Sequence, residues 1–158
     1  MRTTDLRFDL PVLRRRALGR IIDVILWAVF FILLAMPTGS DASGKMTYPM
    51  WVWIVVTIVP IGYETLMVRR AGRTVGKLWS GVKVTTLSGG RPSLLRATVR
   101  AAITWPLLVL IFGELGIWVQ VPALITYVTV FAVALGNSQR RGLHDFAAGT
   151  VVSAGSST

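Results

Sequence analysis

Two carboxylates interrupt long apolar segments of the chain, Asp23 in the first and Glu64 in the second. On insertion scales a charged side chain costs about 2.5–3.5 kcal/mol at the middle of a membrane, and such residues are usually paired or functional. Arg20 and Arg16 precede Asp23 by three and seven residues, which places all three on one helix face. We therefore expect Asp23 to pair with one of these arginines.

Glu64 needs a cation from another helix, because it lies near the predicted end of its own helix, where the helix dipole disfavours a carboxylate. Arg96 and Arg100 enter the third apolar segment at the same depth. These residues predict a charge cluster near one membrane face. Two interpretations are open: ion pairs that hold the helices together, or a site that binds an ion, a proton or a substrate.

His144 and Asp145 are adjacent, as an imidazole and its orienting carboxylate are in a catalytic triad, but no serine or cysteine nucleophile has a recognisable spacing to them. We predict a membrane-surface segment in which Asp145 pairs with a basic residue of the central loop, while Ala147 and Ala148 pack on the bundle. With no cysteine and one histidine, the chain is not expected to bind a metal or a cofactor, or to be an enzyme.

The segment GRTVGKL, residues 72–78, resembles a phosphate-binding loop. That motif needs four residues between its glycines and a serine or threonine after the lysine. Three residues separate Gly72 from Gly76, and Leu78 follows Lys77. We predict a turn that opens an interfacial helix instead.

A basic interfacial loop is predicted over residues 69–93. Helical spacing places four apolar residues on one side of this loop: Val75, Leu78, Trp79 and Val82. Four basic residues lie mostly on the other side: Arg69, Arg70, Arg73 and Lys77. Such a loop is attracted to anionic lipid head groups. After it, the segments VKVTT and RPS, joined by SGG, predict a small hairpin, and Ser93 is expected to cap the next helix.

The composition favours a membrane protein. Of the 158 residues, 53% are hydrophobic and only 15% are charged, and the mean hydropathy is +0.63. The net charge of +10 is typical of nucleic-acid-binding proteins, but too few polar residues are present to cover a soluble domain. We therefore expect the bilayer, and no nucleic acid, as the partner.

Four segments are long and apolar enough to cross a bilayer, approximately residues 17–36, 50–68, 94–112 and 119–136. The short loop GELGI makes the last two an antiparallel pair. The predicted fold class is all-α, a multi-spanning membrane helix bundle of about four transmembrane helices in one domain, residues 1–158. Residues 153–158 are expected to form a flexible tail.

The orientation follows from the basic residues. Sixteen of the 17 lysines and arginines lie in the N-terminal arm, the central loop and the C-terminal tail, and only Lys45 lies elsewhere. The positive-inside rule therefore predicts an inner-membrane protein with cytoplasmic N and C termini. Four aromatic residues are expected near the outer boundary: Tyr48, Trp51, Trp53 and Trp118. A cleavable signal peptide is the alternative for the N-terminus, but Asp23 interrupts its apolar run.

Four stretches, RRALGRIID, YETLMVRRAGRTVGKLWSGVKV, RPSLLRATVR and RGLHDFAAGTVV, together resemble the RDD family of small bacterial membrane proteins over residues 14–152. The resemblance implies that the arginine and two aspartates of the family name are Arg16, Asp23 and Asp145. It implies a loop motif that consists of Gly72, Thr74, Gly76 and Lys77. It also implies a tail motif that consists of His144, Asp145, Ala148, Gly149 and Thr150. Arg20 departs from the family pattern, where an apolar residue is expected.

The resemblance implies a role in transport, with ion or proton exchange suggested for some members. Two functions are therefore considered: transport of a small ion or solute, alone or as an accessory subunit, and a non-catalytic scaffold that binds anionic lipid and a larger membrane partner. Four spans are too few to enclose an aqueous path, so transport would need a homo-oligomer or a membrane-protein partner. A polar cavity reaching mid-membrane would favour transport, and a dry bundle would favour the scaffold.

Overall fold

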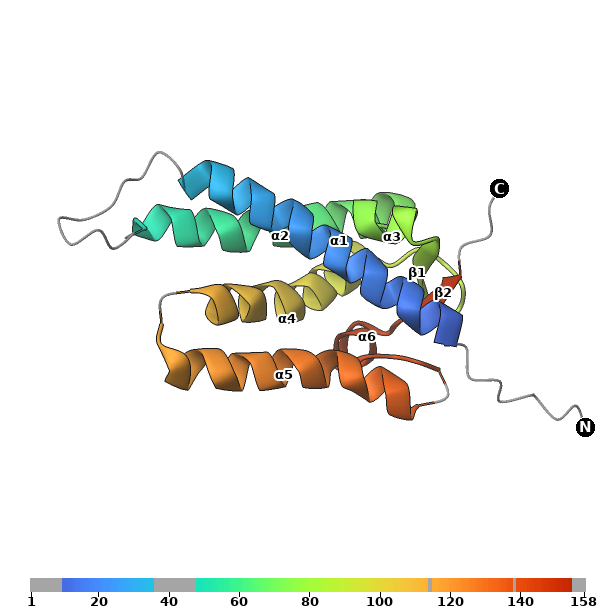
Figure 1. Ribbon diagram of the computed structural model, residues 1–158. Helices are drawn as coiled ribbons and strands as arrows, with labels where there is room; N and C mark the ends of the chain where they lie inside the picture. Colours follow the sequence, from blue (N-terminus) through green and yellow to red (C-terminus); the bar gives the residue numbers. More distant parts are fainter. Residues whose placement is uncertain (1–9, 36–47, 114, 138, 155–158) are drawn as a thin grey trace, which may run out of the picture.

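The computed structural model describes residues 10–35, 48–113, 115–137 and 139–154. Four long helices form the bundle (Figure 1): α1 (Leu10–Ala35), α2 (Met50–Ala71), α4 (Leu94–Phe112) and α5 (Ile117–Gly136). Each is long and apolar enough to cross a membrane. The predicted membrane helix bundle of about four spans is confirmed.

Helix α4 has the predicted bounds, whereas α1, α2 and α5 extend beyond the predicted apolar spans at one end. Helix α1 begins at Leu10 rather than near residue 17, because the arginines that follow are good helix formers and continue the helix past its apolar part. Helix α2 continues to Ala71 and ends at Gly72, whose φ of 68° is in the left-handed region and whose N–H bonds the Val68 carbonyl. A short connection joins α4 to the antiparallel α5, as expected (Figure 1).

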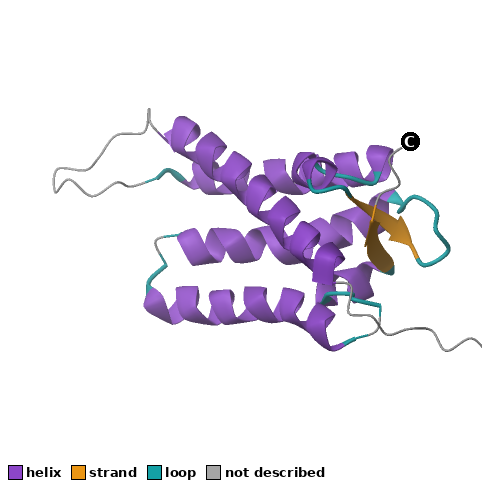
Figure 2. Cartoon of the chain, turned by 45° about the vertical axis from the view of Figure 1, so that its right-hand side comes forward, coloured by secondary structure: helices purple, strands orange, loops and turns teal. Residues whose placement is uncertain are grey.

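Four short elements gather at one end of the bundle, which we call the sheet end (Figures 1 and 2). They are α3 (Val75–Trp79), β1 (Val82–Thr86), α6 (Leu143–Ala148) and β2 (Thr150–Ala154). The predicted cap of α4 is present, since the Ser93 hydroxyl accepts a hydrogen bond from the Arg96 N–H at 3.3 Å. The four short elements carry most residues of the loop motif and the tail motif, so the two motifs lie together at the sheet end.

The two strands pair with each other, so the predicted local hairpin is wrong. Strand β1 is antiparallel to β2, with Val82 opposite Ala154 and Thr86 opposite Thr150. Pro92 in the expected second arm lacks an N–H for a ladder, whereas β2 supplies Val152 to an apolar core. That core comprises Val68, Val82, Val84, Ala97 and Val152.

The tail also departs from expectation. Ser153 and Ala154 lie in β2, so the predicted flexible segment begins too early, and residues 155–158 lie outside the described residues. Ala148 is buried as expected, while Ala147 is exposed.

The long helices carry apolar side chains on their outside. Only 11–28% of each apolar window is buried, and large side chains such as Ile32 and Ile58 are about 60% exposed. This distribution suits lipid, which solvates apolar surface as well as a protein core does. Of the predicted boundary aromatics, Trp51 and Trp118 are exposed near the starts of α2 and α5, at the end opposite the sheet.

Helices α1 and α3 approach each other at two glycines. A Cβ on Gly76 would collide with the Gly19 carbonyl oxygen and lie 2.9 Å from the Asp23 side chain. A Cβ on Gly19 would lie 2.5 Å from the Ser80 hydroxyl oxygen. The contact therefore requires glycine at position 76 and favours it at position 19.

Gly76→Ala is expected to lower the free energy of unfolding by about 1–3 kcal/mol or more, because the added methyl group forces α3 away from α1. Thermal unfolding in detergent measures this loss. The matched control is Gly62→Ala inside α2, where nothing lies within 4 Å of the new methyl group. That variant should gain about 0.5–1 kcal/mol, and equal stabilities for the two variants would contradict the close contact.

Candidate functional site

Seven charged side chains from five elements meet inside the bundle at the sheet end. We call them the charge cluster: Arg16, Arg20 and Asp23 of α1, Glu64 of α2, Lys77 of α3, Arg100 of α4 and Asp145 of α6. None of these side chains is more than 12% exposed. Charges that are so enclosed need partners within reach.

The helices bring Glu64 and Arg100 to one depth. Glu64 lies seven residues before the end of α2, and Arg100 lies six residues after the start of α4. At 1.5 Å per residue, both lie about 10 Å from the sheet-end termini of their helices. The expectation that Arg100 meets Glu64 is met by an ion pair of 3.5 Å between Arg100 Nε and Glu64 Oε1.

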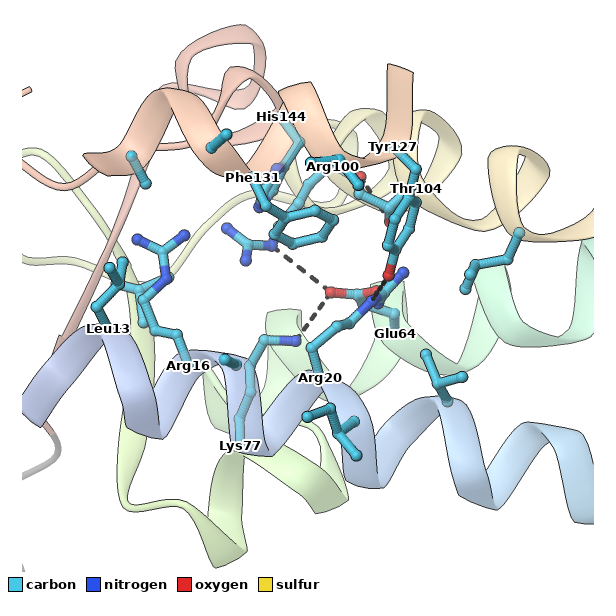
Figure 3. A pocket seen from close by; sticks show the side chains of 18 of the residues that line it. Leu13, Arg16, Arg20, Glu64, Lys77, Arg100, Thr104, Tyr127, Phe131 and His144 are labelled. Carbon is cyan, nitrogen blue, oxygen red and sulfur yellow. Dashed lines mark hydrogen bonds and ion pairs between the residues drawn. The ribbon is translucent and has the colours of Figure 1, made fainter. Parts of the chain in front are cut away.

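Glu64 is surrounded by cationic side chains from three other helices (Figure 3). Its Oε1 accepts a hydrogen bond from Lys77 Nζ at 3.0 Å. Its Oε2 accepts bonds from Arg20 Nη1 at 3.1 Å and from the indole N–H of Trp105 at 2.8 Å. With the Arg100 ion pair, one carboxylate of α2 is tied to α1, α3 and α4.

Asp23 binds the start of α3. The Thr74 hydroxyl donates to Asp23 Oδ2 at 2.6 Å, and the Gly76 N–H donates to Oδ1 at 2.9 Å. Lys77 Nζ lies 3.8 Å from Oδ2. Asp23 therefore satisfies backbone and side-chain donors that the first turn of α3 leaves without helical partners.

The predicted pairing of Asp23 with Arg16 or Arg20 is wrong. Arg16 Nη2 bonds Asp145 Oδ2 at 2.6 Å, and Arg20 bonds Glu64. A guanidinium on a long side chain reaches carboxylates on neighbouring helices, while the short Asp23 side chain meets the nearer donors of α3. Arg96, the other expected partner, is exposed and lies outside the cluster.

Asp145 joins α6 to two of the long helices. It is paired with Arg16 of α1 and with Arg100 of α4. Its Oδ2 also accepts the Gly142 N–H at 3.1 Å, which caps α6. Burial alone would raise the pKa of Asp145, but Arg100 and the other neighbouring charges hold that pKa well below its usual range.

Each residue of the loop motif has a structural role at the sheet end. A Cβ on Gly72 would lie 3.0 Å from the Val84 carbonyl oxygen, and Thr74 is the N-cap of α3. Lys77 is buried at 7% exposure, which corrects its expected place on an exposed basic face. The correction follows from Glu64 and Asp23, which compensate the ammonium for its loss of water.

The tail motif surrounds Asp145. The Thr150 hydroxyl donates to Asp145 Oδ1 at 3.3 Å, and Gly149 ends α6 with a left-handed φ of 61°. His144 is 1% exposed and packs against Phe131, with ring centroids 4.8 Å apart. Burial, together with the charge of Arg100, lowers the pKa of His144 from 6.5 to about 3, so its ring is neutral.

Two aromatic residues at the cluster were not anticipated. The Trp105 ring lies 4.3 Å from the Arg20 guanidinium carbon, besides donating to Glu64. The Tyr127 hydroxyl accepts a bond from Arg20 Nε at 3.0 Å. The sequence contained a signal for both residues. Each is an aromatic residue with a polar tip that lies within an apolar helix, away from the membrane boundary.

A cavity of about 630 Å³ adjoins the cluster. Arg16, Arg20, Glu64, Lys77 and Arg100 line one end, and the remaining walls are mostly apolar (Figure 3). Among the described residues, no group of three His, Cys, Asp or Glu side chains could hold a metal ion. The arrangement can hold an anion against several cations in a setting of low polarity.

The neutral His144 makes stability depend on pH. Because its pKa is lower in the folded protein than in the unfolded chain, the unfolded chain gains protons first as the pH falls below 6.5. Stability is therefore full above pH 6.5 and is expected to fall by about 2 kcal/mol at pH 5. Thermal unfolding between pH 7.5 and pH 5 should show this loss in the wild type and little of it in His144→Gln. The same slope in both proteins would contradict a buried neutral imidazole.

Of the comparisons with known proteins, one finds a match. The model of the RDD family matches residues 10–149, which include every member of the charge cluster, the loop motif, and the tail motif except Thr150. The chain matches no curated protein and no solved structure. Four membrane-length helices, the Arg16–Asp145 ion pair and this match lead to one conclusion: the chain belongs to the RDD family of membrane proteins.

Proposed function

We propose that the chain is a non-catalytic component of the bacterial cytoplasmic membrane that binds anionic lipid and, through its exposed helix faces, a larger membrane partner. In this proposal the sheet end and both termini face the cytoplasm. The positive-inside rule supports this orientation, because the basic residues of α1, α2, α4 and the tail lie at the sheet end.

The balance of charge in the cluster is the observation that carries the proposal. Four cations face three carboxylates, and each carboxylate already has at least two partners. A carrier of protons or sodium ions needs a carboxylate that can exchange its partner. The excess here is positive, and Arg20 Nη2 is buried with no hydrogen-bond partner among the described residues. These features favour an anion as the ligand.

The surface of α3 supports contact with head groups. Trp79 is 79% exposed and Leu78 is 55% exposed, and the exposed Arg69 and Arg70 lie at the end of the preceding helix. A tryptophan beside basic residues is suited to the membrane boundary, where each cation near an anionic surface contributes about 1 kcal/mol. Burial of Lys77 leaves this interfacial role to the arginines.

Transport of a small ion or solute is the second candidate, because the cavity reaches Glu64 and four cations. Against it, the cavity walls beyond the cluster are apolar and offer no continuous polar path. Under this alternative the path would be completed by a second copy or by a partner subunit.

A single-tryptophan protein retaining Trp79 tests the lipid proposal. In vesicles, brominated phosphatidylglycerol should quench Trp79 more strongly than brominated phosphatidylcholine, because anionic lipid accumulates at Arg69 and Arg70. Replacing both arginines with glutamine should remove the difference. A protein retaining only Trp118, which is 89% exposed at the other end, is the matched control and should show no preference.

Equal quenching of Trp79 by the two lipids would overturn the lipid proposal. A parallel flux assay across a pH or sodium gradient addresses the alternative. Flux above that of empty vesicles, lost in Asp23→Asn, would favour transport.

A further inference from the structure

The cavity next to the charge cluster lies between α1 and α5. Its walls come from α1, α4 and α5, with Glu64, Lys77 and His144 at the sheet end. Its volume of about 630 Å³ is within the range of small-molecule sites, roughly 300–1,000 Å³.

The cavity opens sideways. Ile21 and Ile25 on α1 and Leu124 and Val128 on α5 line it from opposite sides, and each is between 48% and 57% exposed. These residues lie within the two membrane-length helices. The mouth therefore faces the hydrocarbon of the bilayer rather than water.

The two ends of the cavity differ in chemistry. The cationic side chains lie at the sheet end, where Leu13, Val82 and Val152 also line the wall. Toward the other end the lining is mostly apolar and includes Leu108, Ile111, Phe112, Leu124 and Val128. The wall of α4 runs from Thr104 to Phe112, a length of about 12 Å. A site with one charged end and one long apolar slot, open to lipid, has the shape of an amphiphile.

Arg20 supplies the most direct evidence for an anionic head. Its side chain lines the cavity and its Nη2 has no hydrogen-bond partner among the described residues. Trp105 and Phe131 flank its guanidinium carbon at 4.3 and 5.8 Å, which fixes the planar group in place. A phosphate oxygen would satisfy the remaining donor and offset the excess charge of the cluster.

We propose that this cavity binds one anionic phospholipid, which enters between α1 and α5 with its phosphate at Arg20 and one acyl chain along α4 and α5. The site rests on the proposed binding of anionic lipid and deepens it. It differs from the surface of α3, because the lipid is held inside the bundle rather than in the surrounding layer.

Native mass spectrometry of the purified protein tests the site. The probes are phosphatidylglycerol and phosphatidylcholine with identical acyl chains, and glycerol phosphate as a head group without chains. We expect one tightly bound phosphatidylglycerol per chain, weaker binding of phosphatidylcholine, and no competition by glycerol phosphate.

Two variants separate the cavity from the surface. Ala132→Trp fills the cavity without changing a charge and should weaken phosphatidylglycerol binding by about tenfold or more. Ala102→Trp is the matched control, since Ala102 is exposed on α4 and does not line the cavity, and should bind as the wild type does. Arg20→Gln removes the donor proposed for the head-group phosphate and should weaken binding of phosphatidylglycerol.

Wild-type affinity in Ala132→Trp would overturn the site, and so would equal binding of the two lipids or displacement by glycerol phosphate. If Ala132→Trp altered only the oligomeric state, the occupant would be a second copy of the chain, which also contradicts the proposal. If mass spectrometry contradicts the cavity site while brominated phosphatidylglycerol still quenches Trp79 more strongly than brominated phosphatidylcholine, the cavity proposal fails and the proposed function stands.

Discussion

A carboxylate among membrane-spanning helices has to find its partners within the protein, and Glu64 shows how far this constraint shapes the fold. Lipid offers no donors, so Glu64 collects them from Arg20, Lys77, Arg100 and Trp105. These donors come from three other helices, so α1, α3 and α4 are held at fixed positions around α2. Removal of water from the cluster makes each of these contacts more sensitive to geometry.

The short elements of the sheet end supply the remaining partners of the charge cluster. Helix α3 brings Lys77 to Glu64 and its first amides to Asp23, and α6 brings Asp145 to Arg16 and Arg100. The β1–β2 pair joins the two segments, since one strand follows each short helix. The loop and tail motifs are remote in the sequence, but together they supply partners to the charged side chains of the long helices.

The sequence predicted the long helices well, because their apolar runs depend on local composition. It also predicted a cluster around Asp23, Glu64 and Arg100, since a buried charge requires a partner. It did not predict which cation meets which carboxylate, because a side chain as long as Arg16 reaches several helices and only the packing selects among them. The pairing of β1 with β2 was missed for the same reason: the local alternative near Pro92 was visible, and the remote strand was not.

The central claim is that the carboxylates pair across elements rather than along α1. A double-mutant cycle of Arg16→Leu and Asp145→Leu, read by unfolding in detergent, tests it most directly. Asp145→Leu alone leaves buried cations unpaired and should cost about 3–5 kcal/mol, and adding Arg16→Leu should recover more than about 0.5 kcal/mol relative to additivity. The same cycle with Asp23→Leu should be additive within that limit. Coupling of Arg16 to Asp23, and none to Asp145, would contradict the account.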